Sequence, residues 1–171
     1  MLTKLRTRTA LLAVALALPF FLFAQKTNPT IERKIDVLLA KMTIEEKAGE
    51  MTQLSLDMIC EGESYNLREP LTINKDKLKK VIQQYHVGSI LNVGTSAHTA
   101  ARWQEIITEI QQEAAQTRLK IPVLYGIDAI HGVNYTLGTT LYPQPLSIAA
   151  TWNPALAERL GAITAYECRA S

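Results

Sequence analysis

Asp128 stands where an acidic side chain can do chemistry, directly after the apolar run Val123–Ile127. An apolar run of this kind is typical of a buried strand, and α/β folds bind ligands at the carboxyl ends of their strands. A carboxylate at such a point can accept hydrogen bonds from two neighbouring hydroxyls, which suits recognition of a polyol or a sugar ring. The alternative interpretation is that Asp128 caps the following turn through nearby backbone. Spacing alone leaves both interpretations open.

His131 follows Asp128 within one turn of loop and is the second candidate binding residue. A histidine before a glycine in a loop is more often a structural hydrogen-bonding residue than a base. Two aromatic residues, Tyr135 and Trp152, are candidates for stacking on a sugar face. Rings in such places more commonly pack at a strand end or in a loop.

The sequence predicts neither a metal site nor a cofactor. His86, His98 and His131 lie 12 and 33 residues apart, and no carboxylate accompanies them at ligand spacing. The chain also has no Gly-x-Gly-x-x-Gly, no P-loop and no Gly-x-Ser-x-Gly. The usual sequence signals of nucleotide binding and of serine hydrolysis are therefore absent.

The elements that must position these residues begin with two helices. The spacing predicts a helix over residues 28–40, with Pro29 suited to its first turn. A second helix should begin at Thr43, because Thr43 and Glu46 match a capping box.

Strands and helices then alternate. We expect strands at 86–94, 121–127 and 147–150, and helices at 75–85, from a cap at Thr95 or Ser96 to about Thr117, and from a cap at Asn153 to about Arg169. This order predicts an α/β fold with parallel strands.

Composition supports a packed globular domain. The 171 residues are 47% hydrophobic and 20% charged, and the length fits one domain or part of a larger one. The net charge of +2 comes from the first residues: from Gln25 onward, 15 basic residues face 16 acidic ones. This balance gives no electrostatic reason to bind nucleic acid or acidic lipid.

Residues 1–24 resemble a secretory signal peptide. A basic start precedes a charge-free run of 15 residues, Ala10–Ala24, which is shorter than the roughly 20 residues of an ordinary membrane span. We expect cleavage before Gln25, no membrane attachment afterwards, and a periplasmic or secreted protein; an uncleaved anchor is the alternative. Cys60 and Cys168 are too few for a disulfide framework, and we expect unpaired buried thiols.

Several segments together resemble the amino-terminal domain of family 3 glycoside hydrolases, the group that contains bacterial β-glucosidases. The segments are 41–53, 87–94, 121–132, 133–144, 149–154 and 165–170. Residues 87–94 resemble the family's first barrel strand. The likeness covers nearly all of the chain after the leader, so we define residues 25–171 as one domain.

The resemblance implies a (β/α)8 TIM-barrel-type domain of which only the amino-terminal part is present. It also implies a retaining glycosidase that hydrolyses terminal β-D-glucosyl residues of gluco-oligosaccharides or aryl glucosides. In that family the aspartate matching Asp128 binds sugar hydroxyls. The family's nucleophile, an aspartate in a Ser-Asp-Trp-like motif, and its glutamate acid/base have no match here. We therefore expect an amino-terminal fragment without catalytic residues, inactive alone.

Other functions stay open at this point. A non-catalytic exported carbohydrate-binding protein is the alternative from a different class, and β-xylosidase and β-N-acetylhexosaminidase are alternatives within the family. The sequence does not predict the oligomeric state.

Overall fold

The computed structural model describes residues 28–63, 66–67, 69–92 and 97–171. The predicted leader lies outside these residues, as do Thr95 and Ser96. The chain divides into two compact units, residues 1–41 and 42–171. In the described part of the first unit, helix α2 spans Pro29–Lys41, as the sequence predicted, and none of its residues is buried.

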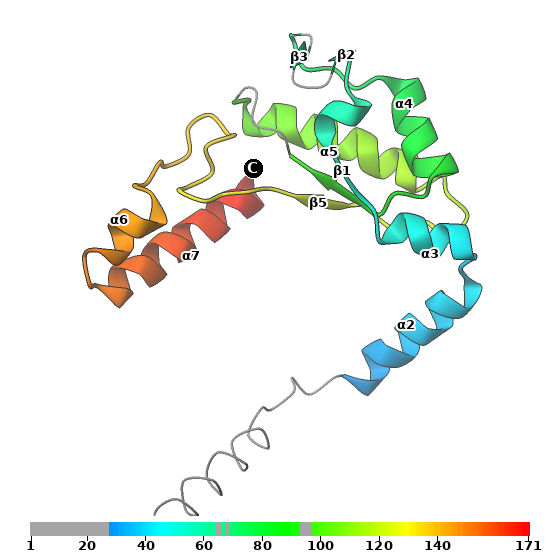
Figure 1. Ribbon diagram of the computed structural model, residues 1–171, viewed down its shortest axis with the longest axis horizontal. Coiled ribbons are helices and arrows are strands. Elements are labelled where there is room, and N and C mark those ends of the chain that lie inside the picture. The colour runs from blue at the N-terminus through cyan, green and yellow to red at the C-terminus, as the bar shows by residue number, and fades with distance from the viewer. Residues whose placement is uncertain (1–27, 64–65, 68, 93–96) are drawn as a thin grey trace, which may run out of the picture. The chain divides into compact units, whose positions relative to one another are not determined.

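The second unit is built on a three-stranded parallel sheet with the order β1-β4-β5 (Figure 1). The strands are β1 (Gln53–Ser55), β4 (Ser89–Leu91) and β5 (Leu124–Gly126). Ile90 of the middle strand pairs with Leu54 on one side and with Tyr125 on the other. The α/β class with parallel strands is therefore confirmed.

Helices cover one face of this sheet. Helix α4 (Lys75–Lys79) continues into η3 (Lys80–Gln84), and α5 spans Ala100–Ala114 along the sheet (Figure 1). The buried core lies between these helices, the short helix η2 (Leu56–Ile59) and the strands. Its fully buried members include Leu56, Ile59, Ile90, Ile106 and Ile110. On the other face Leu124 is 70% exposed.

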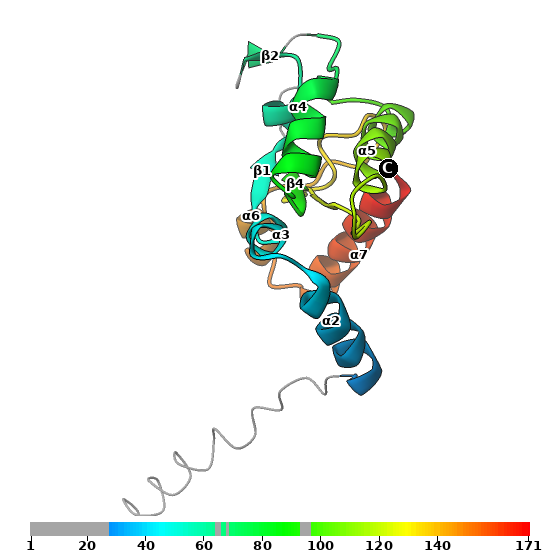
Figure 2. The same ribbon diagram turned by 90° about the vertical axis from the view of Figure 1, so that its right-hand side faces the viewer.

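The remaining elements connect or follow this layer. An antiparallel pair, β2 (Gly62–Glu63) and β3 (Asn66–Leu67), lies between η2 and α4. After β5 a long loop leads to α6 (Pro145–Ala149), which packs on α7 (Pro154–Ala170). The last turn of α7 lies beside α5 (Figure 2). In the described residues no helix is both long and apolar enough to cross a membrane.

Three expectations about the elements are wrong. Residues 147–150 are not a strand: Pro145 begins α6, and Ile148 N–H donates to Gln144 O in a helical turn. The long helix is capped by Thr99, whose hydroxyl accepts from Arg102 N–H, rather than by Thr95 or Ser96. Strand β4 (Ser89–Leu91), which lies within the predicted first strand, is the second strand of the sheet along the chain, because β1 precedes it and pairs with it.

The predicted helix caps at Thr43 and Asn153 are confirmed. The hydroxyl of Thr43 accepts from Glu46 N–H at 3.2 Å, and Thr43 N–H donates to Glu46 Oε2 at 2.9 Å at the start of α3 (Ile44–Glu50). Asn153 caps α7 by accepting from Leu156 N–H at 3.1 Å. In each of these contacts the two partners are three residues apart, so a short sequence pattern is enough to predict the contact.

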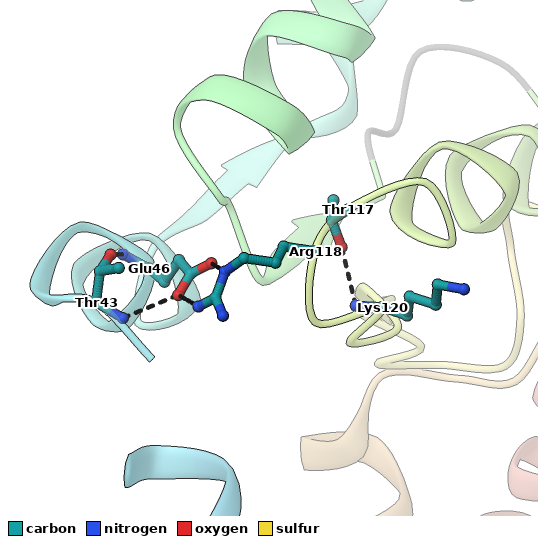
Figure 3. Close-up of polar contacts among 5 residues, drawn as sticks. All are labelled: Thr43, Glu46, Thr117, Arg118 and Lys120. Atoms are coloured by element: carbon teal, nitrogen blue, oxygen red, sulfur yellow. Dashed lines mark hydrogen bonds and ion pairs between the residues drawn. The ribbon is translucent and has the colours of Figure 1, made fainter. Parts of the chain in front are cut away.

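Glu46 also makes a contact that the sequence does not reveal. Arg118, 72 residues away, donates from Nε at 3.1 Å and from Nη2 to the two oxygens of the same carboxylate (Figure 3). Nearby, the hydroxyl of Thr117 accepts from Lys120 N–H. Glu46 therefore joins the start of α3 to the turn that leads into β5.

Acid should weaken this junction. The Arg118 hydrogen bond and the Thr43 backbone bond hold the pKa of Glu46 below its ordinary value of 4.5. The charged form is thus favoured by folding, so its contribution is full above pH 4.5 and is lost as the pH falls below that value. We expect Glu46→Gln to lower stability at neutral pH and to flatten the acid limb of the profile, measured by urea unfolding from neutral pH to about pH 3.

Glu105→Gln is the matched control, because it removes the carboxylate of an exposed ion pair with Arg102 on α5. It should leave the acid limb unchanged. Identical acid limbs for the wild type and Glu46→Gln would contradict the role of Glu46.

Candidate functional site

Asp128 lies two residues after the end of β5, at the carboxyl edge of the sheet. Its side chain is exposed. None of the residues that the structure describes donates a hydrogen bond to its carboxylate, and no backbone cap of the following turn forms there. The carboxylate is therefore available to hydroxyl donors from outside the chain.

The structure places a second carboxylate at this edge, one that the sequence analysis missed. Asp57 lies two residues after β1, which pairs with the opposite side of β4 from β5. Unlike Asp128, it is buried, and the hydroxyl of Ser55 donates to it. Asp57 is thus a structural acid of the core, and Asp128 is the accessible one. Because β1 itself was not predicted, no sequence signal located Asp57 at a strand end.

His131 does not stand with Asp128 in one cavity. His131 is half-buried and lines an apolar cavity of about 410 Å³ between the loop and helices α6 and α7, whereas Asp128 does not line it. The backbone O of His131 accepts from Tyr142 N–H at 2.8 Å. This backbone contact ties the two limbs of the loop together.

The two candidate aromatic residues differ. Tyr135 packs against the core, and its backbone O accepts from Trp103 Nε1 at 2.7 Å and from His98 N–H at 3.0 Å, as the packing interpretation expects. Trp152 is 92% exposed, in the turn between α6 and α7, and does not pack. Its ring is accessible, at a different part of the chain from the Asp128 loop.

A polar pair joins the middle of β5 to the residue after β4. Tyr125 donates from its hydroxyl to Asn92 Oδ1 at 2.6 Å, and both residues line a cavity of about 140 Å³ together with Cys168. Asn92 Nδ2 is buried, and none of the described residues accepts a hydrogen bond from it. Burial, with a smaller contribution from Cys60, raises the pKa of Tyr125, so its phenol stays protonated and donating.

Neither thiol has the character of a nucleophile. Both cysteines are free in the structure; Cys60 is buried as expected, whereas Cys168 is only half-buried. Burial, aided by Asp57, raises the pKa of Cys60 to about 11, and burial with Glu167 raises the pKa of Cys168. Thiolates are therefore scarce at neutral pH. In the described residues no group of three His, Cys, Asp or Glu side chains is placed to hold a metal ion.

Residues 43–171 match the profile of the "Glycosyl hydrolase family 3 N terminal domain". The chain belongs to glycosyl hydrolase family 3. The matched region begins at the capping threonine of α3 and includes the sheet, Asp128 and helix α7. The matched residues therefore coincide with the second compact unit, residues 42–171, whose sheet has β4 at its centre.

Several curated relatives of this chain carry names of glycosidases. A lysosomal β-glucosidase of Dictyostelium discoideum is 34% identical over 70% of this chain, and a periplasmic β-glucosidase of Salmonella typhimurium is 29% identical over 76%. A β-xylosidase of Formosa agariphila is 41% identical over 39% of it. The chain spans 15%, 14% and 10% of the lengths of these three relatives.

A close backbone approach holds the site loop of this family 3 domain. Gly132 has a φ of +93°, and a Cβ added to it would stand 2.0 Å from Thr140 O. Gly138, in the same loop, has a φ of +91° but nothing within 4 Å of the added Cβ. The two glycines share a backbone conformation and differ in the space around them.

Alanine at these two positions should separate strain from crowding. We expect Gly138→Ala to lower the free energy of unfolding by about 1–2 kcal/mol through backbone strain alone. Gly132→Ala should cost about 1–3 kcal/mol more, because the methyl group must displace the Thr140 carbonyl. Urea unfolding measures both, and limited proteolysis should cut within residues 128–144 faster in Gly132→Ala. Equal losses for the two variants would show that the limbs are not in contact.

Proposed function

We propose that this chain is the amino-terminal part of an exported β-glucosidase. Its substrates are β-linked gluco-oligosaccharides or aryl glucosides, from which the complete enzyme removes terminal β-D-glucosyl residues with retention of configuration. The observation that carries the proposal is the exposed carboxylate of Asp128 at the carboxyl end of β5 in a family 3 domain. The β-glucosidase names of several relatives support the substrate class.

Asp128 is the substrate-binding residue in this proposal. Its carboxylate accepts hydrogen bonds from two adjacent hydroxyls of the sugar in the subsite where the glycosidic bond breaks. His131 is the secondary candidate, and its backbone contact with Tyr142 keeps the loop beside Asp128 in shape. The three parallel strands β1, β4 and β5 are part of a (β/α)8 barrel in this proposal.

Residues 25–171 bind sugar but do not hydrolyse it in this proposal. Retaining hydrolysis needs two accessible carboxyl groups about 5 to 5.5 Å apart, one to attack the anomeric carbon and one to protonate the leaving oxygen. Of the two carboxylates at the described strand ends, Asp57 is buried and accepts a hydrogen bond from Ser55. Asp128 is the accessible one of the two. We place the nucleophile and the acid/base beyond Ser171, and a cleaved signal peptide at residues 1–24.

The proposal is tested with the product of the whole reading frame and with residues 25–171 alone. We expect the first to hydrolyse 4-nitrophenyl β-D-glucoside, with β-glucose as the first product by proton NMR, and the second to show no hydrolysis. The secreted product should begin at Gln25. A reading frame that stops after Ser171 would favour the non-catalytic binding protein, and α-glucose as the first product would contradict retention.

A β-xylosidase is the second candidate, since a relative with that name is 41% identical over part of the chain. The same assay with 4-nitrophenyl β-D-xyloside discriminates between the two. A kcat/KM higher for the xyloside than for the glucoside would assign the enzyme to xylosides and leave the role of Asp128 unchanged.

Asp128→Ala should remove two charge-assisted hydrogen bonds to the sugar. At roughly 1.5 to 3 kcal/mol each, the loss is about 3 to 6 kcal/mol, or about a hundredfold to ten-thousandfold in kcat/KM. Asp128→Asn should cost less, because the amide keeps one acceptor. Asp76→Ala, which removes an exposed carboxylate on α4, is the control and should leave kcat/KM unchanged. A normal kcat/KM with a lowered melting temperature in Asp128→Ala would support a purely structural role.

A further inference from the structure

Glu167, on α7, holds the loop that carries the candidate site. Thr140 donates twice to its carboxylate, from N–H to Oε2 at 3.1 Å and from Oγ1 to Oε1 at 2.9 Å. In the described part of the chain, no other α7 side chain hydrogen-bonds this loop. Since both oxygens of Glu167 receive a donor from the same residue, Thr140 is fixed in position and in orientation.

Thr140 in turn lies against the limb of the loop that follows Asp128. Its carbonyl oxygen occupies the space where a Cβ of Gly132 would stand, and Tyr142 N–H donates to His131 O at 2.8 Å. Gly132 and Leu141 form an antiparallel bridge. No free space separates the two limbs here, so a displacement of Thr140 displaces the backbone at residues 131–132.

Asp128 lies four residues before Gly132, and the described residues offer no hydrogen bond to its side chain. Its place is therefore set by the backbone on either side of it. Strand β5 fixes the residues before Asp128, and the contacts of His131 and Gly132 fix the residues after it. The second of these two constraints depends on Thr140.

We propose that Glu167 is a positioning residue for sugar binding, acting on Asp128 through Thr140 and Gly132. This inference rests on the proposed function of Asp128. Glu167 does not touch the sugar; it holds the loop in the shape that presents the Asp128 carboxylate. Helix α7 thereby sets the geometry of the binding site.

The contact depends on the two acceptor oxygens of Glu167, because both of them face donors of Thr140. Glu167→Met keeps a side chain of similar length and removes both oxygens, so neither hydrogen bond can form. Glu167→Gln is less informative, because a glutamine can accept from Thr140 N–H and donate its NH2 group to the Thr140 hydroxyl oxygen. A residue that only filled space would tolerate Glu167→Met.

The test uses the product of the whole reading frame and two readouts, the inhibition constant of D-glucose and KM against kcat for 4-nitrophenyl β-D-glucoside. Glu167→Met and Thr140→Val should raise the inhibition constant and KM roughly tenfold or more, since misplacement by about 1 Å costs up to a hundredfold. Thr140→Ser keeps the hydroxyl and should retain the wild-type values. Glu158→Met, which removes an exposed carboxylate on the same helix, is the matched control and should change neither.

A double-mutant cycle decides whether Glu167 acts through Asp128. If it does, Glu167→Met should add little to the loss in Asp128→Ala. Losses that multiply, or a lowered thermal midpoint with unchanged KM and inhibition constant in Glu167→Met, would overturn the positioning role. If Asp128→Ala leaves the inhibition constant of D-glucose unchanged, the proposed function of Asp128 fails. If Asp128→Ala weakens the binding of D-glucose but the Glu167 and Thr140 variants bind it normally, the positioning role of Glu167 fails and the role of Asp128 stands.

Discussion

The parallel pairing of β4 on both sides is the constraint on which the rest of the second unit depends. Because β4 is central, its backbone groups bond to β1 on one edge and to β5 on the other. Ile90 at its centre is completely buried beneath the helix layer. Helix α5 and strands β1 and β5 are therefore positioned relative to one strand, and the edge at which Asp57, Asn92 and Asp128 emerge is set with them.

The loop after β5 is held by contacts from two helices. Trp103 of α5 donates to Tyr135 O, and Glu167 of α7 accepts from Thr140. Gly132, which precedes both of these residues, allows the two limbs of the loop to touch. A loop built in this way presents a side chain at a fixed place without bonding that side chain, which leaves the acceptors of Asp128 for a ligand.

Burial separates the roles of the polar groups in and near the sheet. Asp57 is enclosed and bonded by Ser55, and Cys60 and Tyr125 stay protonated because burial raises their pKa values. These groups stabilise the core and supply neither a nucleophile nor a base. Asp128, by contrast, is exposed at the same edge of the sheet. This contrast is the physical basis for the proposal that Asp128 binds sugar while the buried groups take no part in catalysis.

The amino-acid sequence alone determined the local structure and the family. The caps at Thr43 and Asn153 and the apolar face of α5 were predictable because each involves partners within a few residues or along one helix. The tertiary structure decided where β1 pairs, since Gln53–Ser55 has no apolar run and its partners lie 36 residues away. It also joined Glu46 to Arg118 and Glu167 to Thr140. These contacts join side chains 72 and 27 residues apart, and no spacing in the sequence encodes them.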